Sequence, residues 1–123
     1  MLIADNLVLP ATPPLSTVGF KQALGENDMI GVVATLKVAE GKNAEFEAIF
    51  TDLAEQVRTN EPGNLAYALT KSRTDPQTYK VLELYADQDA LTSHGQTEYF
   101  KAAGPKLGPC LGGRPEIEYL DGV

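Results

Sequence analysis

The segment that most restricts the fold is YKVLELYADQDALTSHGQTEYF (79–100), which has the pattern of a strand that runs directly into a helix. Because side chains alternate across a strand, one face of this strand carries Tyr79, Val81, Glu83 and Tyr85. Asp87 then stands at the position of a helix N-cap, where its carboxylate can accept a hydrogen bond from a free backbone N–H. The segment therefore predicts a strand and a helix with a short connection, and it places a carboxylate in an otherwise apolar strand face.

Glu83 and His94 have the side chains in this segment best suited to acid–base chemistry. His94 is the only histidine of the chain and follows Leu91 by three residues, so both lie on the helix face that turns toward the sheet. Histidine exchanges protons near neutral pH, and an enclosed, unpaired glutamate has a raised pKa. We predict that both residues are catalytic. The alternatives are a packing role for His94 and, for Glu83, pairing with a backbone amide, Lys71 or Arg73.

The other elements follow from periodicity and turn chemistry. Residues 29–39 alternate as a strand, and apolar residues from Phe46 to Val57 recur at helical spacing, with Asn43 as the predicted N-cap. The remaining predicted elements are, in order, a helix stop at 61–63, a strand at 64–73, a hairpin turn at 74–77, the strand and helix described above, a break at Gly95, a short helix over 97–103 ended by Gly104-Pro105, and a strand at 116–120.

The resulting order, β-α-β-β-α-β, predicts an α+β ferredoxin-like fold: a four-stranded antiparallel sheet with both helices on one face. Leu82, Leu84 and Val33 make the other sheet face apolar as well. Two helices cannot cover both faces, and a soluble monomer rarely exposes so large an apolar area. We therefore predict a homodimer closed by its two sheets. The alternative is a monomer that is shielded by its own N-terminal arm.

Residues 1–28 have no sustained period and carry Pro10, Pro13 and Pro14 within a short span. They predict an irregular N-terminal arm, and residues 29–123 predict the folded domain. The alternative is an arm that acts as a lid or clasps a dimer. The N-terminus has no basic segment typical of a signal peptide, and no window is apolar enough to span a membrane.

Composition excludes several function classes. The net charge of −7, with no cluster of Lys and Arg, argues against nucleic acids and anionic membranes as partners. Cys110 is the only cysteine, so no intrachain disulfide can form, and we predict a cytoplasmic location and an inert thiol. One cysteine and one histidine do not predict a transition-metal site.

Three stretches carry a resemblance to a known family: EPGNLAYAL (61–69), TDPQTYKVLELYADQDAL (74–91), and His94 with Phe100. Together they resemble the antibiotic biosynthesis monooxygenase family of dimeric α/β-barrel proteins, over about residues 29–120. The resemblance implies a pocket between helices and sheet, and oxygen chemistry that needs no cofactor. It places Glu83 and His94 in that pocket, with Phe100 as a wall.

The resemblance implies a quinol-like or polycyclic phenolic substrate that reacts with O2 and itself supplies the electrons. The protein would remove a proton and hold the anion that forms. Tyr67 and Tyr85 are predicted to bind the substrate oxygen, with core packing as the alternative, and Arg73 is predicted as a cation for a phenolate. The alternatives are a non-catalytic ligand-binding or stress-related dimer and a haem protein with His94 as axial ligand. The absence of Trp disfavours haem and anthrone-type substrates.

Overall fold

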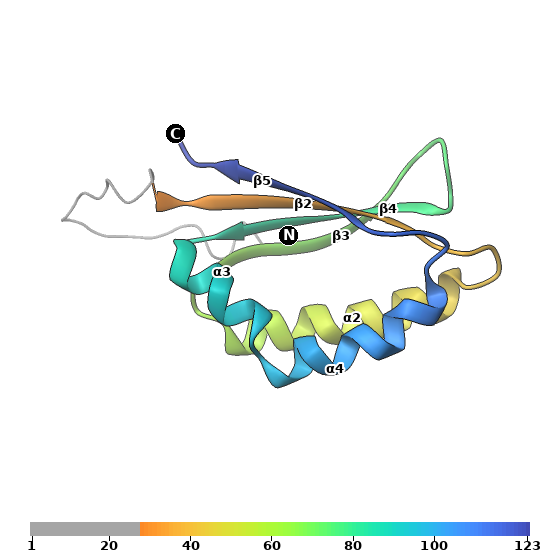
Figure 1. The fold of residues 1–123 in the computed structure, drawn as a ribbon, viewed down its shortest axis with the longest axis horizontal. Helices are drawn as coiled ribbons and strands as arrows, with labels where there is room; N and C mark the ends of the chain where they lie inside the picture. Colours follow the sequence, from red (N-terminus) through yellow and green to blue (C-terminus); the bar gives the residue numbers. More distant parts are fainter. Residues whose placement is uncertain (1–27) are drawn as a thin grey trace.

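The computed structural model describes residues 28–123. Its elements, in chain order, are β2 (Ile30–Lys37), α2 (Asn43–Asn60), β3 (Asn64–Lys71), β4 (Thr78–Tyr85), α3 (Gln88–Gly95), α4 (Glu98–Leu107), the 3-10 turn η2 (Gly108–Cys110) and β5 (Glu116–Asp121) (Figure 1). The arm predicted for residues 1–28 lies outside the described residues, except for Asp28. Within the described range, no helix has the length and apolar character needed to cross a membrane.

The four strands form one antiparallel sheet in the order β3-β4-β2-β5. The helices all lie on one face of this sheet (Figure 1). β3 and β4 pair directly as a hairpin, as the turn sequence predicted. The order of elements and the antiparallel pairing confirm the predicted ferredoxin-like α+β fold.

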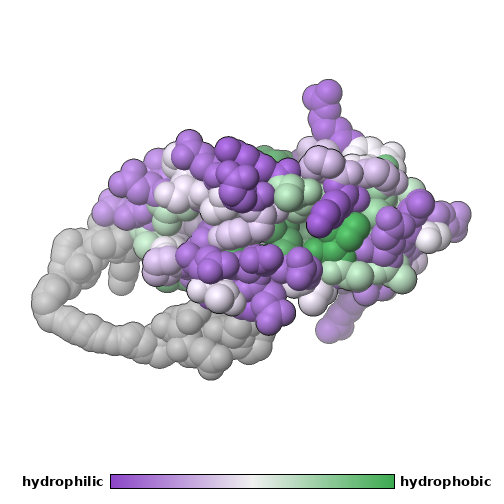
Figure 2. Space-filling model, turned by 90° about the horizontal axis from the view of Figure 1, so that it is seen from below, coloured by the Kyte–Doolittle hydropathy of each residue, from purple (hydrophilic) through white to green (hydrophobic). Residues whose placement is uncertain are grey.

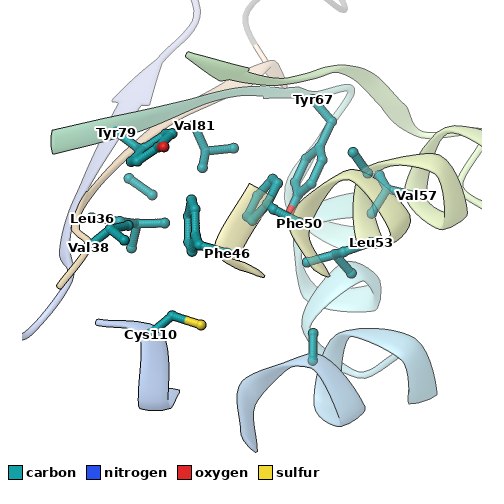
Figure 3. Close-up of a cluster of buried hydrophobic side chains, with 13 residues drawn as sticks. Leu36, Val38, Phe46, Phe50, Leu53, Val57, Tyr67, Tyr79, Val81 and Cys110 are labelled. Atoms are coloured by element: carbon teal, nitrogen blue, oxygen red, sulfur yellow. The ribbon is translucent and has the colours of Figure 1, made fainter. Parts of the chain in front are cut away.

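The core lies between α2 and the middle of the sheet (Figure 3). The Phe46 ring packs on the Tyr79 ring with centroids 4.8 Å apart, and Phe50 stacks on Tyr67 at 5.7 Å with an interplanar angle of 8°. Aromatic pairs of this kind contribute about 0.5–1.5 kcal/mol each beyond the area they bury. This packing fixes α2 under the sheet, and so fixes where its C-terminus meets β3.

The start of α2 differs from the prediction. Lys42, not Asn43, occupies the N-cap position, and its side chain makes no cap hydrogen bond. The Asn43 side chain instead donates to the Pro76 carbonyl and to the Tyr79 hydroxyl, each at 2.9 Å, and accepts from the Gln77 amide. The predicted cap was wrong because Asn43 ties the helix to the β3–β4 turn.

The end of α4 also differs from the prediction. Gly104-Pro105 does not end the helix, which continues to Leu107 with Pro105 inside it. Proline removes the N–H that would bond to the carbonyl of Lys101, but Lys101 is exposed, so water can satisfy that carbonyl. The predicted break after Gly95 is confirmed, since α3 ends there and Thr97 caps α4.

The sheet face that points away from the helices carries an apolar group that we call the open face: Val33, Ala68, Leu82, Leu84 and Leu120. Leu82 and Leu120 are each 44% exposed. No helix within residues 28–123 covers this face. The opposite, helix-bearing side is mostly hydrophilic, with a small hydrophobic area in its middle (Figure 2).

Candidate active site

A pocket of about 710 Å³ opens between α3, α4 and the end of the sheet where β4 and β5 finish. Most of its wall is apolar, contributed by Ile30, Val32, Leu91, Phe100, Ile117 and Tyr119. The polar residues that line it are Glu83, Gln88, Thr92, His94, Gln96 and Asp121. Both residues predicted to be catalytic therefore face the same pocket, and Phe100 forms part of its wall as expected.

His94 is positioned by the caps at both ends of α3. The Asp87 carboxylate accepts from the Ala90 N–H at 2.9 Å, which confirms the predicted N-cap. At the other end the Thr97 hydroxyl donates to the His94 carbonyl at 3.0 Å. The imidazole is only 4% exposed and lies 4.6 Å, centroid to centroid, from the Phe100 ring. His94 is therefore held in place by its backbone on one side and by aromatic packing on the other.

Glu61 is a site residue that the sequence pattern did not predict. Its side chain is 9% exposed, and its carboxylate oxygens lie 3.1 and 3.0 Å from Nδ1 of His94. The Tyr99 hydroxyl donates to the same carboxylate at 2.5 Å. The EPG sequence at 61–63 indicates the end of a helix, but it does not indicate the direction in which the Glu61 side chain points. A carboxylate at a helix C-terminus, where the dipole disfavours it, was the available signal.

Glu83 enters the pocket from β4. Burial, with a contribution from the charge of Glu61, raises the pKa of Glu83 to about 7, against the lowering effect of a hydrogen bond from Tyr85. The Tyr85 hydroxyl donates to Oε1 of Glu83 at 2.8 Å. Near neutral pH the carboxyl group is therefore partly protonated, and its other oxygen is the one available to carry the proton.

The other predicted binding residues lie outside the pocket lining. Tyr67 and Tyr85 are fully enclosed, with ring centroids 5.3 and 5.5 Å from that of His94. Burial raises the pKa of both phenols, so both remain protonated. Arg73 is exposed in the β3–β4 turn, at the opposite end of the sheet from the pocket. The structure thus brings the tyrosines, but not Arg73, up to His94 and Glu83.

Among residues 28–123, no three His, Cys, Asp or Glu side chains are grouped so that they could hold a metal ion. Cys110, predicted to be inert, is fully buried, and burial raises the pKa of its thiol.

Comparison with protein-family models matches residues 29–106 to the antibiotic biosynthesis monooxygenase family. The chain belongs to this family. The match contains the elements from β2 to most of α4 and includes Glu61, Glu83 and His94. This confirms the resemblance to the family that was carried by EPGNLAYAL (61–69), TDPQTYKVLELYADQDAL (74–91), and His94 with Phe100.

Solved structures of similar proteins agree with this assignment. A Caulobacter crescentus protein, described as a candidate antibiotic biosynthesis monooxygenase, is 59% identical, with a TM-score of 0.77 over 84% of this chain and 97% of that one. A conserved Methanosarcina mazei protein is 27% identical, with a TM-score of 0.76 over 82% and 99% of the two chains. SnoaB, a cofactor-independent oxygenase from Streptomyces nogalater, is 22% identical, covers 76% and 91%, and has a TM-score of 0.67, so it shares the fold.

An uncharacterised protein from Synechocystis sp. is 29% identical over 99 residues, which is 80% of this chain. The chain spans 64% of that relative's length. The antibiotic biosynthesis monooxygenase family and its fold are therefore shown for this protein.

Proposed function

We propose that this protein is a cofactor-independent monooxygenase that acts on an uncharged, quinol-like or polycyclic phenolic substrate. The observation that carries the proposal is the pairing of His94 and Glu83 in one largely apolar pocket. The volume of about 710 Å³ is in the range of sites that enclose a small aromatic ligand. Flat aromatic rings suit a wall formed by Phe100, Tyr119 and aliphatic side chains.

The two polar groups have complementary roles. His94 takes the proton of the substrate hydroxyl, which leaves an electron-rich phenolate. Protonated Glu83 then donates a hydrogen bond to the developing anion, as a neutral donor in an apolar site can. Tyr85 supports this role, because its hydroxyl already occupies one oxygen of Glu83.

The electron balance requires no added reductant. A phenol that reacts with O2 at a ring C–H position gives a quinone and one molecule of water. One oxygen atom enters the new carbonyl group and the other leaves as water, so the substrate supplies every electron that O2 takes up. The protein has only to form the phenolate and hold it where O2 can reach it.

The pocket charge favours uncharged substrates. Glu83 and Asp121 line it, and none of the described residues lining it is Lys or Arg. A carboxylate or phosphate placed there would meet like charge with no compensating cation. Haem is disfavoured for the same reason, because its propionates need cationic partners and no Lys or Arg within residues 28–123 lines the pocket.

We expect naphthol to bind at least about 10-fold more tightly than hydroxynaphthoate, which adds a carboxylate to the same rings. The Kd values can be measured by isothermal titration calorimetry at neutral pH. In Glu83→Gln the difference should shrink, because the fraction of Glu83 that is ionised at neutral pH no longer repels the carboxylate. Equal affinities in the wild type would contradict the uncharged-substrate proposal.

An oxygen-electrode screen over small phenols and quinols tests the proposed activity. Uptake that depends on protein, and yields quinone and water without added flavin or metal, supports it. Ligand-induced thermal stabilisation without uptake across the screen favours the non-catalytic binding alternative. A Soret band on haem titration, abolished in His94→Gln, favours the haem alternative.

We also propose that two copies close over the open face. Val33 lies on the open face opposite Leu82, whereas Val81 is packed in the core. We expect Val33→Lys to convert the dimer to monomer in light scattering at micromolar concentration, because dimerisation would bury its unpaired charge. Thr51→Lys adds the same charge on exposed α2 and should leave the dimer intact. A monomeric wild type would contradict this.

A further inference from the structure

Glu61 has an unusual position for a glutamate. It is the C-cap residue of α2, and its backbone N–H bonds to the Val57 carbonyl at 3.0 Å. A carboxylate there opposes the helix dipole, and its side chain is almost fully enclosed. Enclosing a carboxylate is costly unless hydrogen-bond donors replace the lost water. The donors that surround Glu61 therefore explain why it is tolerated there.

The fold brings those donors close by packing α3 against the EPG loop. Gly63 makes this possible, since a Cβ at that position would lie 2.6 Å from the Cβ of Ala90. The Ala86 N–H bonds to the Gly63 carbonyl at 2.9 Å, which holds the end of β4 against the same loop. As a result, His94 on α3 and Tyr99 on α4 both reach the Glu61 carboxylate.

The hydrogen bonds at Glu61 determine where the imidazole proton resides. An ionised carboxylate only accepts hydrogen bonds, so the two oxygens, about 3 Å from Nδ1 of His94, favour the tautomer that carries the proton on Nδ1. In the neutral imidazole, Nε2 then has a free lone pair. Among residues 28–123 Nε2 has no hydrogen-bond partner, while the ring lines the pocket.

We propose that Glu61, held by Tyr99, is a positioning residue that fixes the Nδ1–H tautomer of His94 and so leaves Nε2 as the proton acceptor of the pocket. Its catalytic consequence rests on the proposed function. The substrate hydroxyl proton moves to Nε2, and the Glu61 carboxylate balances the charge of the imidazolium that forms. The proton on Nδ1 stays in place throughout.

Tyr99 is suited to holding Glu61. Burial first, and then the hydrogen bond to Glu61 and its charge, raise the pKa of Tyr99 to about 12. The hydroxyl therefore keeps its proton at neutral pH and remains a donor to Oε2. Because His94 and Tyr99 contact the Glu61 carboxylate from two sides, its rotation is restricted and it stays in contact with Nδ1.

The tautomer can be observed directly, because the chain has a single histidine. Selective 15N-histidine labelling gives one imidazole, and at about pH 9 its neutral form reports the tautomer through the two nitrogen shifts. For the wild type we expect at least about a 10-fold excess of Nδ1–H, as a hydrogen bond to a charged acceptor would give. In Glu61→Gln we expect this excess to be lost, since the amide can donate to Nδ1 as readily as accept.

Glu47→Gln is the matched control. Glu47 also accepts from a tyrosine hydroxyl, that of Tyr79, but contacts no histidine. Its substitution should leave the wild-type tautomer unchanged. A wild-type spectrum of the Nε2–H tautomer would overturn the proposal even if Glu61→Gln failed to fold, and so would an unchanged Nδ1–H excess in folded Glu61→Gln.

Oxygen uptake separates this inference from the proposed function. If both hold, Glu61→Gln lowers uptake by at least about 10-fold together with the change of tautomer. If the tautomer changes as expected but the wild type consumes no oxygen with any phenol or quinol, the proposed function fails and the assignment of Glu61 is supported. If Glu61→Gln has lost the excess of the Nδ1–H tautomer but still consumes oxygen at the wild-type rate, the positioning role of Glu61 is overturned.

Discussion

Replacing His94 by glutamine is expected to lower the rate of oxygen uptake by about 100-fold or more, the usual contribution of general acid–base catalysis. Glutamine keeps an N–H that can donate to Glu61, so the enclosed carboxylate is not left without a partner. It removes the group that accepts the substrate proton. Substrate affinity should change less, because the apolar wall of the pocket is unaffected. Steady-state rates at saturating substrate, together with Kd from calorimetry, measure the two effects separately.

Ser93→Ala is the matched control for this substitution. Ser93 is the neighbour of His94 on α3, is exposed and does not line the pocket, so uptake should remain at the wild-type rate. Alanine at position 94 is a poorer test, since it leaves the Glu61 carboxylate with an empty space beside it. A His94→Gln variant with wild-type turnover and pH profile would show that His94 has only a packing role.

The fold was predictable because its local signals agree with one another. The alternation in β2, the helical spacing of α2 and the turn at 74–77 each indicate one element, and the rule against crossing connections leaves few antiparallel topologies that join them in that order. Strand alternation put Glu83 on the same strand face as Val81, the three-residue spacing from Leu91 turned His94 toward the sheet, and the family resemblance placed both residues in one pocket. The sequence therefore brought Glu83 and His94 to the same side of the sheet.

Glu61 could not be predicted in the same way because its environment is assembled from distant parts of the chain. Its partners, His94 and Tyr99, lie 33 and 38 residues further along the sequence. A side chain just beyond a helix end has no periodicity that fixes its direction. A negative charge at the C-terminus of a helix is disfavoured by the helix dipole, so a glutamate at position 61 indicates that hydrogen-bond donors from elsewhere in the fold stabilise its carboxylate.

Two other differences between prediction and structure also have tertiary causes. Arg73 was predicted to contact the substrate from its charge alone, but the hairpin places the turn at one end of the sheet and the pocket at the other. The Asn43 cap failed because a long-range bond to Tyr79 competes for the same side chain. In both cases tertiary structure decided how a polar side chain is used.

Replacing Glu83 by glutamine is expected to make the folded protein less sensitive to pH. The pKa of Glu83 is raised from 4.5 to about 7 in the folded state, chiefly by burial. Below pH 4.5 the Glu83 carboxyl group is protonated in both the folded and the unfolded protein. Between pH 4.5 and about 7 it loses its proton in the unfolded chain but keeps it in the folded protein. The free energy of unfolding therefore falls as pH rises, by up to about 3 kcal/mol, once the folded carboxyl group ionises.

Urea titrations at fixed protein concentration, from about pH 4 to about pH 8, measure this effect as the difference between wild type and Glu83→Gln. Other carboxylates contribute to both proteins and cancel. Relative to wild type, Glu83→Gln should gain stability across this range, whereas Glu55→Gln, on the exposed side of α2, should not. A constant difference would mean that the pKa of Glu83 is not raised in the folded state, so that Glu83 is ionised at neutral pH. It could not then be the neutral donor to a phenolate, and oxygen uptake would not decline as pH rises through about 7.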